Sequence, residues 1–299
     1  MSSTVIIAGG TGFIGSVLSK ELISKGYNVL IISRKIPDIE KDENITYKTW
    51  DSLQSVDFED VSALINLAGA SLAAGKWTDS YKKIIIDSRV NSTRALVEFV
   101  SKTKKPPKVF INASAVGYYG DRADEVLIES SSSGQGFLAK VCIEWENEAI
   151  NASKYTRTVI ARIGVVLDKN EGALSKMLLP FRFFAGGPLG RGNQYFPWIH
   201  IKDIIGLFIF AIENNSLNGS MNFTSPKPVT MNEFAKTLGK VMKKPSIFKV
   251  PEAVLKIMLG ESAEMITNSQ RVNPEIALSN GYDFRFADVN EALYDIISQ

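Results

Sequence analysis

The chain has 299 residues, of which 45% are hydrophobic and 22% charged, as expected for a globular protein that can bury its own core. Its 34 basic and 32 acidic residues leave a net charge of +2, and the short basic runs at 102–105 and 243–244 are typical of solvated helix ends. This balance argues against a nucleic-acid-binding protein. A single cysteine excludes an intrachain disulfide, and one histidine with one cysteine argues against a usual zinc site.

The first residues enter an apolar run directly, without the basic segment of a signal peptide. The longest apolar stretch, 204–212, is far short of the ~20 residues that span a bilayer. Cys142 lies in an apolar helical pattern, which favours a packed thiol over a nucleophile. We therefore expect a soluble, cytoplasmic protein that does not bind membranes.

Short apolar runs alternate with helical patterns along the first half of the chain. A buried run at 5–8, a helical pattern ending near Gly26 and a second run at 29–32 predict two parallel strands with a right-handed crossover. Further strands are expected at 45–49, 63–67, 109–113 and 158–162, with helices at 79–102 and 137–153. Six strands separated by helices predict an α/β fold with a doubly wound parallel sheet of the Rossmann type.

The pattern changes after residue 162, where glycine and proline become frequent. A helix is expected near 174–185, another at 201–214 and a strand at 220–224, and from 230 onward the chain reads as mostly helical. We expect residues 1–165, with about 200–225, to form the Rossmann domain. Residues of about 166–199 and 226–299 would form a smaller, mostly helical substrate-binding lobe.

Three glycines spaced three residues apart follow the first predicted strand and begin the first predicted helix. In a Rossmann domain the first allows a tight turn, the second admits a phosphate to the backbone, and the third lets helix and strand pack closely. The free N–H groups of the helix then face the pyrophosphate. A plain strand-to-helix turn is the alternative, but the strand-loop-helix-strand context favours a dinucleotide site at Gly9, Thr11, Gly12, Phe13, Ile14 and Gly15.

The residues after the second predicted strand indicate which cofactor, NAD or NADP, the chain binds. NAD-specific sites place an acidic residue there against the ribose 2′-hydroxyl, whereas this chain has Ser33, Arg34 and Lys35, and no acid until Asp38. A guanidinium pairs well with a 2′-phosphate, and a serine hydroxyl adds a hydrogen bond. Arg34 and Lys35 could also be merely solvated, but the pattern favours NADP(H).

These and other motifs resemble extended and atypical short-chain dehydrogenases/reductases, and more closely the NAD-dependent epimerase/dehydratase-like proteins of the SDR39U1 type. The resemblance runs nearly end to end, and its last piece is absent from generic epimerases. The pieces are GGTGFIG at 9–15, NLAGAS at 66–71, SRVNSTRALV at 88–97, SAVGYYGD at 114–121, FLAKVCIEWE at 137–146, RIGVVL at 162–167, PWIHIKDI at 197–204 and GESAEMITNSQRVNPEIALSNGYDF at 260–284.

The resemblance implies further cofactor-binding residues. Leu67, Ala68 and Gly69 would lie along the cofactor, Asp51 would lie near the adenine, and Arg162 begins a segment that often borders the nicotinamide. It also implies that Ser114 occupies the place of the catalytic serine. Lys140 lies in the helix where the YxxxK lysine is expected, with a role in catalysis or in binding the nicotinamide ribose.

One residue departs from the family pattern. Four positions before Lys140 stands Gly136, where the superfamily has the tyrosine that exchanges a proton during hydride transfer. Either Tyr118 or Tyr119 supplies the phenol, or the chain binds cofactor without the usual chemistry. His200 is expected to be a buried, hydrogen-bonded residue rather than a catalytic base.

The sequence therefore predicts an NADP-dependent oxidoreductase or epimerase for a small polar substrate, such as a nucleotide-linked sugar. A simple carbonyl reductase is a variant of this function. A non-catalytic NADPH-binding sensor or scaffold is the alternative, because of Gly136. The expected partners are a small-molecule substrate and, in a homodimer, a second copy of the chain.

Overall fold

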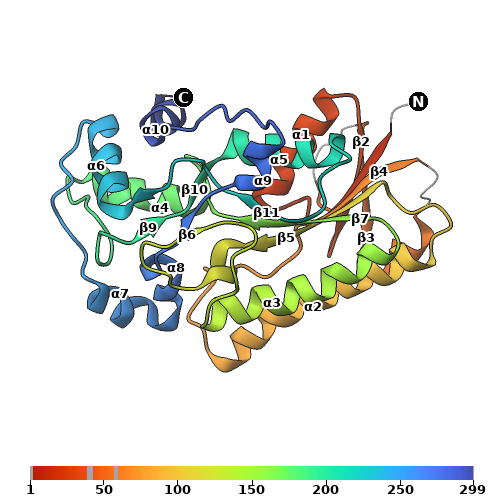
Figure 1. Ribbon diagram of the computed structural model, residues 1–299, viewed down its shortest axis with the longest axis horizontal. Coiled ribbons are helices and arrows are strands. Elements are labelled where there is room, and N and C mark those ends of the chain that lie inside the picture. Colours follow the sequence, from red (N-terminus) through yellow and green to blue (C-terminus); the bar gives the residue numbers. More distant parts are fainter. Residues whose placement is uncertain (1–2, 39–42, 57–59, 299) are drawn as a thin grey trace.

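The computed structural model describes residues 3–38, 43–56 and 60–298. Its centre is a seven-stranded parallel sheet with the strand order β11-β7-β5-β4-β1-β2-β3 (Figure 1). Short apolar, β-branched runs form the strands, as expected for a sheet covered on both faces. The strands are β1 (Thr4–Ala8), β2 (Asn28–Ser33), β3 (Ile45–Thr49), β4 (Val61–Asn66), β5 (Val109–Ala115), β7 (Arg157–Ile163) and β11 (Gly219–Phe223).

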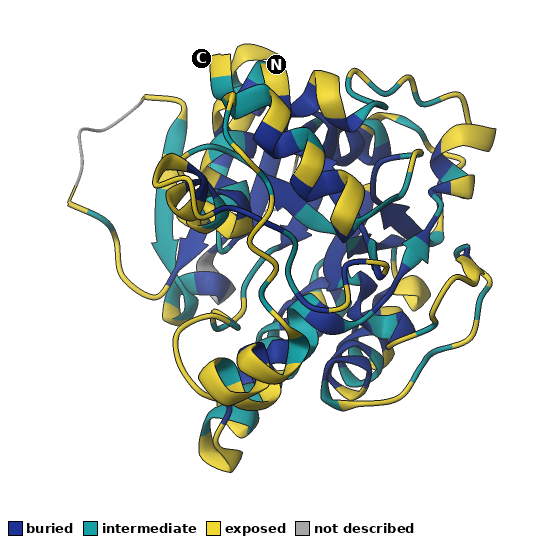
Figure 2. Ribbon diagram, turned by 90° about the vertical axis from the view of Figure 1, so that its left-hand side faces the viewer, coloured by how far each residue is buried: buried dark blue, intermediate teal, exposed yellow. Residues whose placement is uncertain are grey.

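Helices cover both faces of this sheet. On one face α1 (Phe13–Ser24) and α5 (Ile201–Glu213) pack over a core that includes Ile7 and Phe208. On the other face lie α2 (Asp79–Lys102) and α3 (Phe137–Ala149), which pack side by side (Figure 1). The sheet is consequently the most buried layer of the molecule (Figure 2).

Most of the remaining elements gather at one end of the sheet, at the left of Figure 1, whereas the helix at Glu275–Ser279 packs on β11. At that end α4 (Gly172–Arg182) and α6 (Met231–Met242) share a third core with α10 (Val289–Ser298). The other helices are α7 (Glu252–Leu259), α8 (Glu264–Thr267) and α9 (Glu275–Ser279). Three small strand pairs complete the fold: β8 (Val165–Leu167) with β10 (Trp198–His200), β9 (Tyr195–Phe196) with β12 (Val229–Thr230), and β6 (Val126–Leu127) with β13 (Arg271–Val272).

The predicted doubly wound fold is confirmed, and helix α2 has the predicted bounds. Helix α3 is shorter than expected, because the chain tightens into a 3-10 turn at Ile150–Lys154. Helix α4 ends at Arg182, and Phe184 then takes a positive φ of 60°, which an α-helix does not accommodate. Within the described ranges, no helix is both long enough and apolar enough to cross a bilayer.

Candidate cofactor and active site

The strand order reverses between β1 and β4, since β2 and β3 continue to one side of β1 and β4 and β5 to the other. In such sheets ligands bind outside the carboxyl ends of the strands at this switch point. Register pairs Ala8 with both Ile32 and Asn66, so the segments after β1, β2 and β4 emerge side by side. We call the space above these strand ends the crevice.

Residues 9–15, the glycine loop, cross the floor of the crevice. Gly9 has a φ of +79°, and a Cβ there would lie 2.8 Å from the Leu67 carbonyl. A Cβ at Gly15 would lie 2.6 Å from the Gly10 Cα, so α1 can approach the backbone of the loop this closely only with a glycine at position 15. Gly12 faces open space apart from the Gly9 carbonyl oxygen.

Helix α1 begins at the glycine loop, and no side chain of the described residues caps its amino end. No side chain caps Gly12, and the first turn, which includes Phe13 and Ile14, contains no acidic residue. Thr11 is exposed beside it. Free N–H groups and the positive end of the helix dipole therefore face the crevice, which is the arrangement that binds a phosphate.

The segment after β2 carries the charged residues expected there. The Ser33 hydroxyl is buried and donates to the Lys35 carbonyl oxygen at 2.6 Å, so it shapes the turn. Arg34 and Lys35 are exposed. No carboxylate of the described residues forms an ion pair with either of them. Asp51 is exposed in the 3-10 helix Trp50–Ser55 that follows β3.

The segment Leu67–Gly69 after β4 is held between the glycine loop and α2. Gly9 contacts the Leu67–Ala68 peptide on one side. The Asn66 side chain accepts from the Ala68 N–H at 3.1 Å, and Ser88 on α2 accepts from the Ala70 N–H at 3.0 Å. These bonds fix the backbone of the segment, so it forms a rigid wall of the crevice.

A buried polar cluster lies beyond this wall. Ser114 on β5, Arg162 on β7 and Asn222 on β11 occupy one register row of three neighbouring strands. The Ser114 hydroxyl donates to Glu146 Oε1 at 2.6 Å, and Arg162 binds both carboxylate oxygens of Glu146, at 3.0 and 2.8 Å. All four side chains are at least nine-tenths buried. Together with Tyr119 they form what we call the Ser114 cluster.

Tyr119 completes the cluster from the turn after β5. Its buried hydroxyl accepts from Arg162 at 3.0 Å and donates to Asn222 Oδ1, 2.7 Å away. Burial raises the pKa of Tyr119 to about 12, although Arg162 opposes that rise. The hydroxyl of Tyr119 therefore makes its hydrogen bonds within the protein, which indicates a structural role for this residue.

Tyr118 precedes Tyr119 in the 3-10 turn Val116–Tyr119, and the two rings meet edge to face with their centroids 5.3 Å apart. Tyr118 is half-buried, and its ring lies on the Arg162 guanidinium, 3.5 Å from ring centroid to Cζ. Its hydroxyl makes no hydrogen bond with the described part of the chain. Of the two tyrosines, Tyr118 is the one with a free phenol.

Helix α3 presents Cys142 and Glu146 to Ser114, and not Lys140 as the sequence suggested. Leu138 and Cys142 contact the turn at Gly117, and Glu146 follows one helical turn later at i+8. Lys140 is on another side of the helix: its side chain is 66% exposed and its Nζ lies 3.8 Å from Glu144. The structure therefore does not bring Lys140 to Ser114.

The backbone at Gly136 does not readily accommodate the tyrosine that the superfamily has four positions before Lys140. Gly136 is the N-cap of α3 with a φ of +100°, and a Cβ there would meet the Glu264 carboxylate. Cys142 takes the place beside Ser114 instead, and burial raises the pKa of its thiol to about 11. This thiol is thus the packed group that the sequence predicts.

The distinctive C-terminal piece acts as a strap across the cluster. Gln270 donates to the carbonyl oxygens of Val116 and Gly120, at 2.9 and 3.1 Å, and so holds the turn that carries the two tyrosines. Asn222 donates to the Asn273 carbonyl oxygen at 3.0 Å. The sequence analysis assigns this piece to the C-terminal lobe but predicts none of these bonds, because they join residues about 50 to 150 positions apart.

The sequence analysis missed Glu146 and Asn222 as members of the Ser114 cluster. Glu146 had a usable signal, since an acidic residue at i+8 from Leu138 falls on the apolar face of α3. Asn222 had none, because only the sheet register places it beside Arg162. Arg162, expected at the cofactor, instead uses its donors on Glu146, Tyr119 and the Glu129 carbonyl oxygen.

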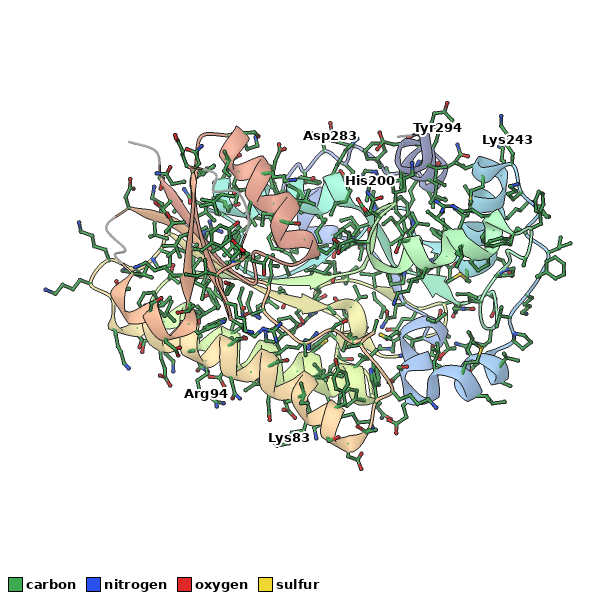
Figure 3. All side chains as sticks on the ribbon, turned by 180° about the vertical axis from the view of Figure 1, so that it is seen from behind. Lys83, Arg94, His200, Lys243, Asp283 and Tyr294 are labelled. Atoms are coloured by element: carbon green, nitrogen blue, oxygen red, sulfur yellow. The ribbon has the colours of Figure 1, made fainter. Side chains whose placement is uncertain are left out.

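His200 is buried, as predicted, and its position is labelled in Figure 3. Its Nδ1 accepts from the Lys202 N–H at 3.0 Å, and its Nε2 lies 3.3 Å from Asp295 on α10. Burial lowers the pKa of His200 to about 4, although Asp295 opposes that fall. Asp203 pairs with the Arg285 and Phe286 N–H groups instead, so it forms no dyad with His200.

Comparison with known proteins agrees with this geometry. A model of the NAD dependent epimerase/dehydratase family matches residues 5–223, and a domain of unknown function, DUF1731, matches 250–296. The chain is 38% identical to the epimerase family protein YfhF of Bacillus subtilis, with 98% of each chain covered. It is 35% identical to the human epimerase family protein SDR39U1, with 98% of this chain and 99% of the human one covered.

Solved structures give the same result. The crystal structure of human SDR39U1 with NADPH superposes with a TM-score of 0.92 at 34% identity, over 99% of both chains. UDP-glucuronic acid 4-epimerase from Bacillus cereus, in complex with UDP-glucuronic acid and NAD, superposes with a TM-score of 0.78 at 17% identity, over 99% of both chains. The second likeness concerns the fold alone.

Proposed function

Because the chain belongs to the NAD dependent epimerase/dehydratase family, we propose that it is an NADPH-dependent oxidoreductase or epimerase acting on a small polar substrate. One observation carries the proposal: an uncapped helix at the glycine loop lies beside a strand end that carries Arg34 without a carboxylate partner among the described residues. The NADPH in the human relative's crystal supports this choice of cofactor.

The crevice fits a dinucleotide phosphate by shape and by charge. The side of Gly12 that a Cβ would fill is open, so an oxygen-rich group can approach the backbone there. The first-turn N–H groups of α1 supply donors, and Arg34 would hold a 2′-phosphate. When bound, NADPH would supply a hydride from its nicotinamide ring, and the oxidised form, NADP, would accept one there.

Hydride transfer to or from a carbon–oxygen bond also requires a proton to move at the oxygen. Tyr118 is the phenol for this step, because its hydroxyl has no protein partner in the described part of the chain and its ring is fixed on Arg162. Ser114 is the nearer hydroxyl to the strand end, but its proton is already engaged by Glu146. Tyr118 is thus the proton donor and acceptor, and Ser114 positions the surrounding turn.

A cavity of about 410 Å³ beside this turn supports a small polar substrate. Polar side chains line it, among them the carboxylates of Asp121 and Glu264, and burial raises the pKa of Glu264. Among the described residues that line it, Arg122 is the one cation, and it already pairs with Glu125. Carboxylates repel a diphosphate, so this cavity favours a hydroxyl-rich group such as a sugar ring over the diphosphate of a nucleotide sugar.

A second function, NADPH binding without turnover, has its own support. The exposed position of Lys140 and the closed bonding of Tyr119 leave the crevice without the usual serine–tyrosine–lysine set. A protein of this kind turns over no compound, so Tyr118→Phe has no activity to remove.

The test is a single-turnover assay with purified protein, NADPH or NADP, and a panel of sugar nucleotides, free sugars and carbonyl compounds. A reductase changes the absorbance of the nicotinamide, whereas an epimerase converts a sugar with cofactor retained, visible by NMR. We expect turnover with at least one compound, lost in Tyr118→Phe and kept in Lys140→Met. NADPH binding with no turnover across the panel would favour the second function.

A further inference from the structure

Two turns at the outer end of the C-terminal lobe expose large apolar side chains. One turn follows α4 and carries Phe183 and Phe184. The other carries Ile247 and Phe248 in the connection from α6 to α7, which runs along the left edge of Figure 1. These four side chains are 54–74% exposed. Single exposed apolar residues are common on proteins, but a group of large ones marks an interaction surface.

The two turns lie side by side and are tied together. The N–H groups of Ile247 and Phe248 both donate to the Gly186 carbonyl oxygen, each at 3.1 Å. Across the same junction, the Lys244 Nζ lies 3.6 Å from the centroid of the Phe184 ring. The exposed side chains therefore belong to one preformed surface and not to two independent loops.

The charged residues of these two segments are all basic. Residues 172–190 and 234–251 contain seven lysines or arginines and no aspartate or glutamate. Within the described ranges no carboxylate forms an ion pair with any of the seven. Because the whole chain has a net charge of only +2, the rest of it is net negative. We call the four exposed apolar side chains, together with the cations of the two turns, the cationic face; these cations are Arg182, Lys243, Lys244 and Lys249.

The charge of the cationic face selects among possible partners. In a symmetric dimer that meets through this face, the same cations would oppose one another, which disfavours a second copy of the chain. Protein–protein interfaces are depleted in lysine, whereas six of the seven cations are lysines. The surface of an anionic bilayer satisfies both kinds of group, because lysine ammonium groups reach the lipid phosphates while apolar side chains enter the boundary of the acyl chains.

We propose that the cationic face binds the surface of a membrane that contains anionic lipids. Its lysines contact the headgroups, and its four apolar side chains enter the boundary below them. The inference revises the expectation from the sequence that the chain does not bind membranes. That expectation considered continuous apolar runs, whereas this surface is assembled from two turns about 60 positions apart. It is independent of the proposed function.

Sedimentation of the full chain with sucrose-loaded vesicles tests the proposal. Vesicles of phosphatidylcholine and phosphatidylglycerol in equal parts present an anionic surface, and vesicles of phosphatidylcholine alone are the neutral control. We expect binding to the anionic vesicles to be about tenfold or more the stronger, and to weaken at high salt. Phe183→Ser should weaken it about tenfold, because an inserted ring is lost, and Lys243→Gln about fivefold, because one cation is lost.

Matched control substitutions lie on α2, well away from the cationic face. Figure 3 labels Lys83 on this helix and Lys243 on the cationic face, far apart in the molecule. The neighbouring Ile84 is 51% exposed, so Ile84→Ser removes an apolar group comparable to that of Phe183. Ile84→Ser and Lys83→Gln should leave vesicle binding within about twofold.

Three results would overturn the proposal. The first is wild-type protein that does not prefer the anionic vesicles. The second is an equal loss of binding in Phe183→Ser and Ile84→Ser. The third is self-association of the chain that Phe183→Ser abolishes, without vesicle binding, which would assign the face to a second copy. Ile247→Ser gives the same comparison if Phe183→Ser fails to fold.

Discussion

The charged groups at the two ends of the crevice differ in whether they have partners within the protein. At the glycine loop, Arg34 and Lys35 have no carboxylate partners among the described residues, and α1 begins uncapped. In the Ser114 cluster every charged or hydroxyl group is bonded to another protein group. The difference teaches that the first region is built to receive a ligand, whereas the second holds the sheet, α3 and the C-terminal strap together.

The largest expected effect comes from a substitution in the Ser114 cluster. Glu146→Gln keeps the shape of the side chain but leaves the buried Arg162 without its counter-charge. Removing one partner of a buried ion pair costs about 3–5 kcal/mol, and we expect a loss of that size in the free energy of unfolding by denaturant at pH 7. Glu144→Gln, at a half-buried position of the same helix that pairs with no buried cation, is the control. A loss below about 1 kcal/mol would contradict the closed-cluster account.

The next effect concerns His200, whose charge the fold excludes. Its pKa falls from 6.5 to about 4 on folding, so the unfolded chain binds its proton more readily. The stability it contributes is present above pH 6.5 and is lost as the pH falls to 4, on the order of 3 kcal/mol. The groups that face it are Asp295, Lys202 and Asp168.

His200→Asn should therefore show a flatter fall of unfolding free energy between pH 6.5 and 4 than the wild type. Denaturant unfolding at several pH values measures both curves. Parallel curves would mean that His200 is protonated in the native state.

A smaller effect separates the two neighbouring tyrosines. Tyr119→Phe leaves Asn222 Oδ1 and one Arg162 donor without a bond, at a cost of about 1–3 kcal/mol in unfolding free energy. Tyr118→Phe removes a hydroxyl with no protein partner in the described chain and should change stability by less than about 0.5 kcal/mol. Thermal and denaturant unfolding of both variants decide this, and the reverse order would exchange their roles.

The smallest effect is expected at Lys140. Its exposed side chain lies outside both regions, so Lys140→Met should shift stability by less than about 0.5 kcal/mol and leave NADPH affinity unchanged. A tenfold loss of affinity would place Lys140 at the cofactor after all.

The ligand-receiving region was predictable from the sequence because its elements are local. The glycine loop follows β1 directly and leads into α1, and Arg34 follows β2 directly. The closed region was only partly predictable, because its contacts depend on register and on the rotation of a helix. Ser114, Arg162 and Asn222 meet through strand pairing across more than 100 residues, and a difference of two positions on α3 separates the exposed Lys140 from Cys142.

The most direct test of the central claim is a calorimetric comparison of NADPH and NADH binding to the wild-type chain and to Arg34→Met. The account predicts that NADPH binds about tenfold or more tightly than NADH, and that the preference disappears in Arg34→Met. Wild-type protein that gives no heat of binding with either dinucleotide, or that prefers NADH, would contradict it.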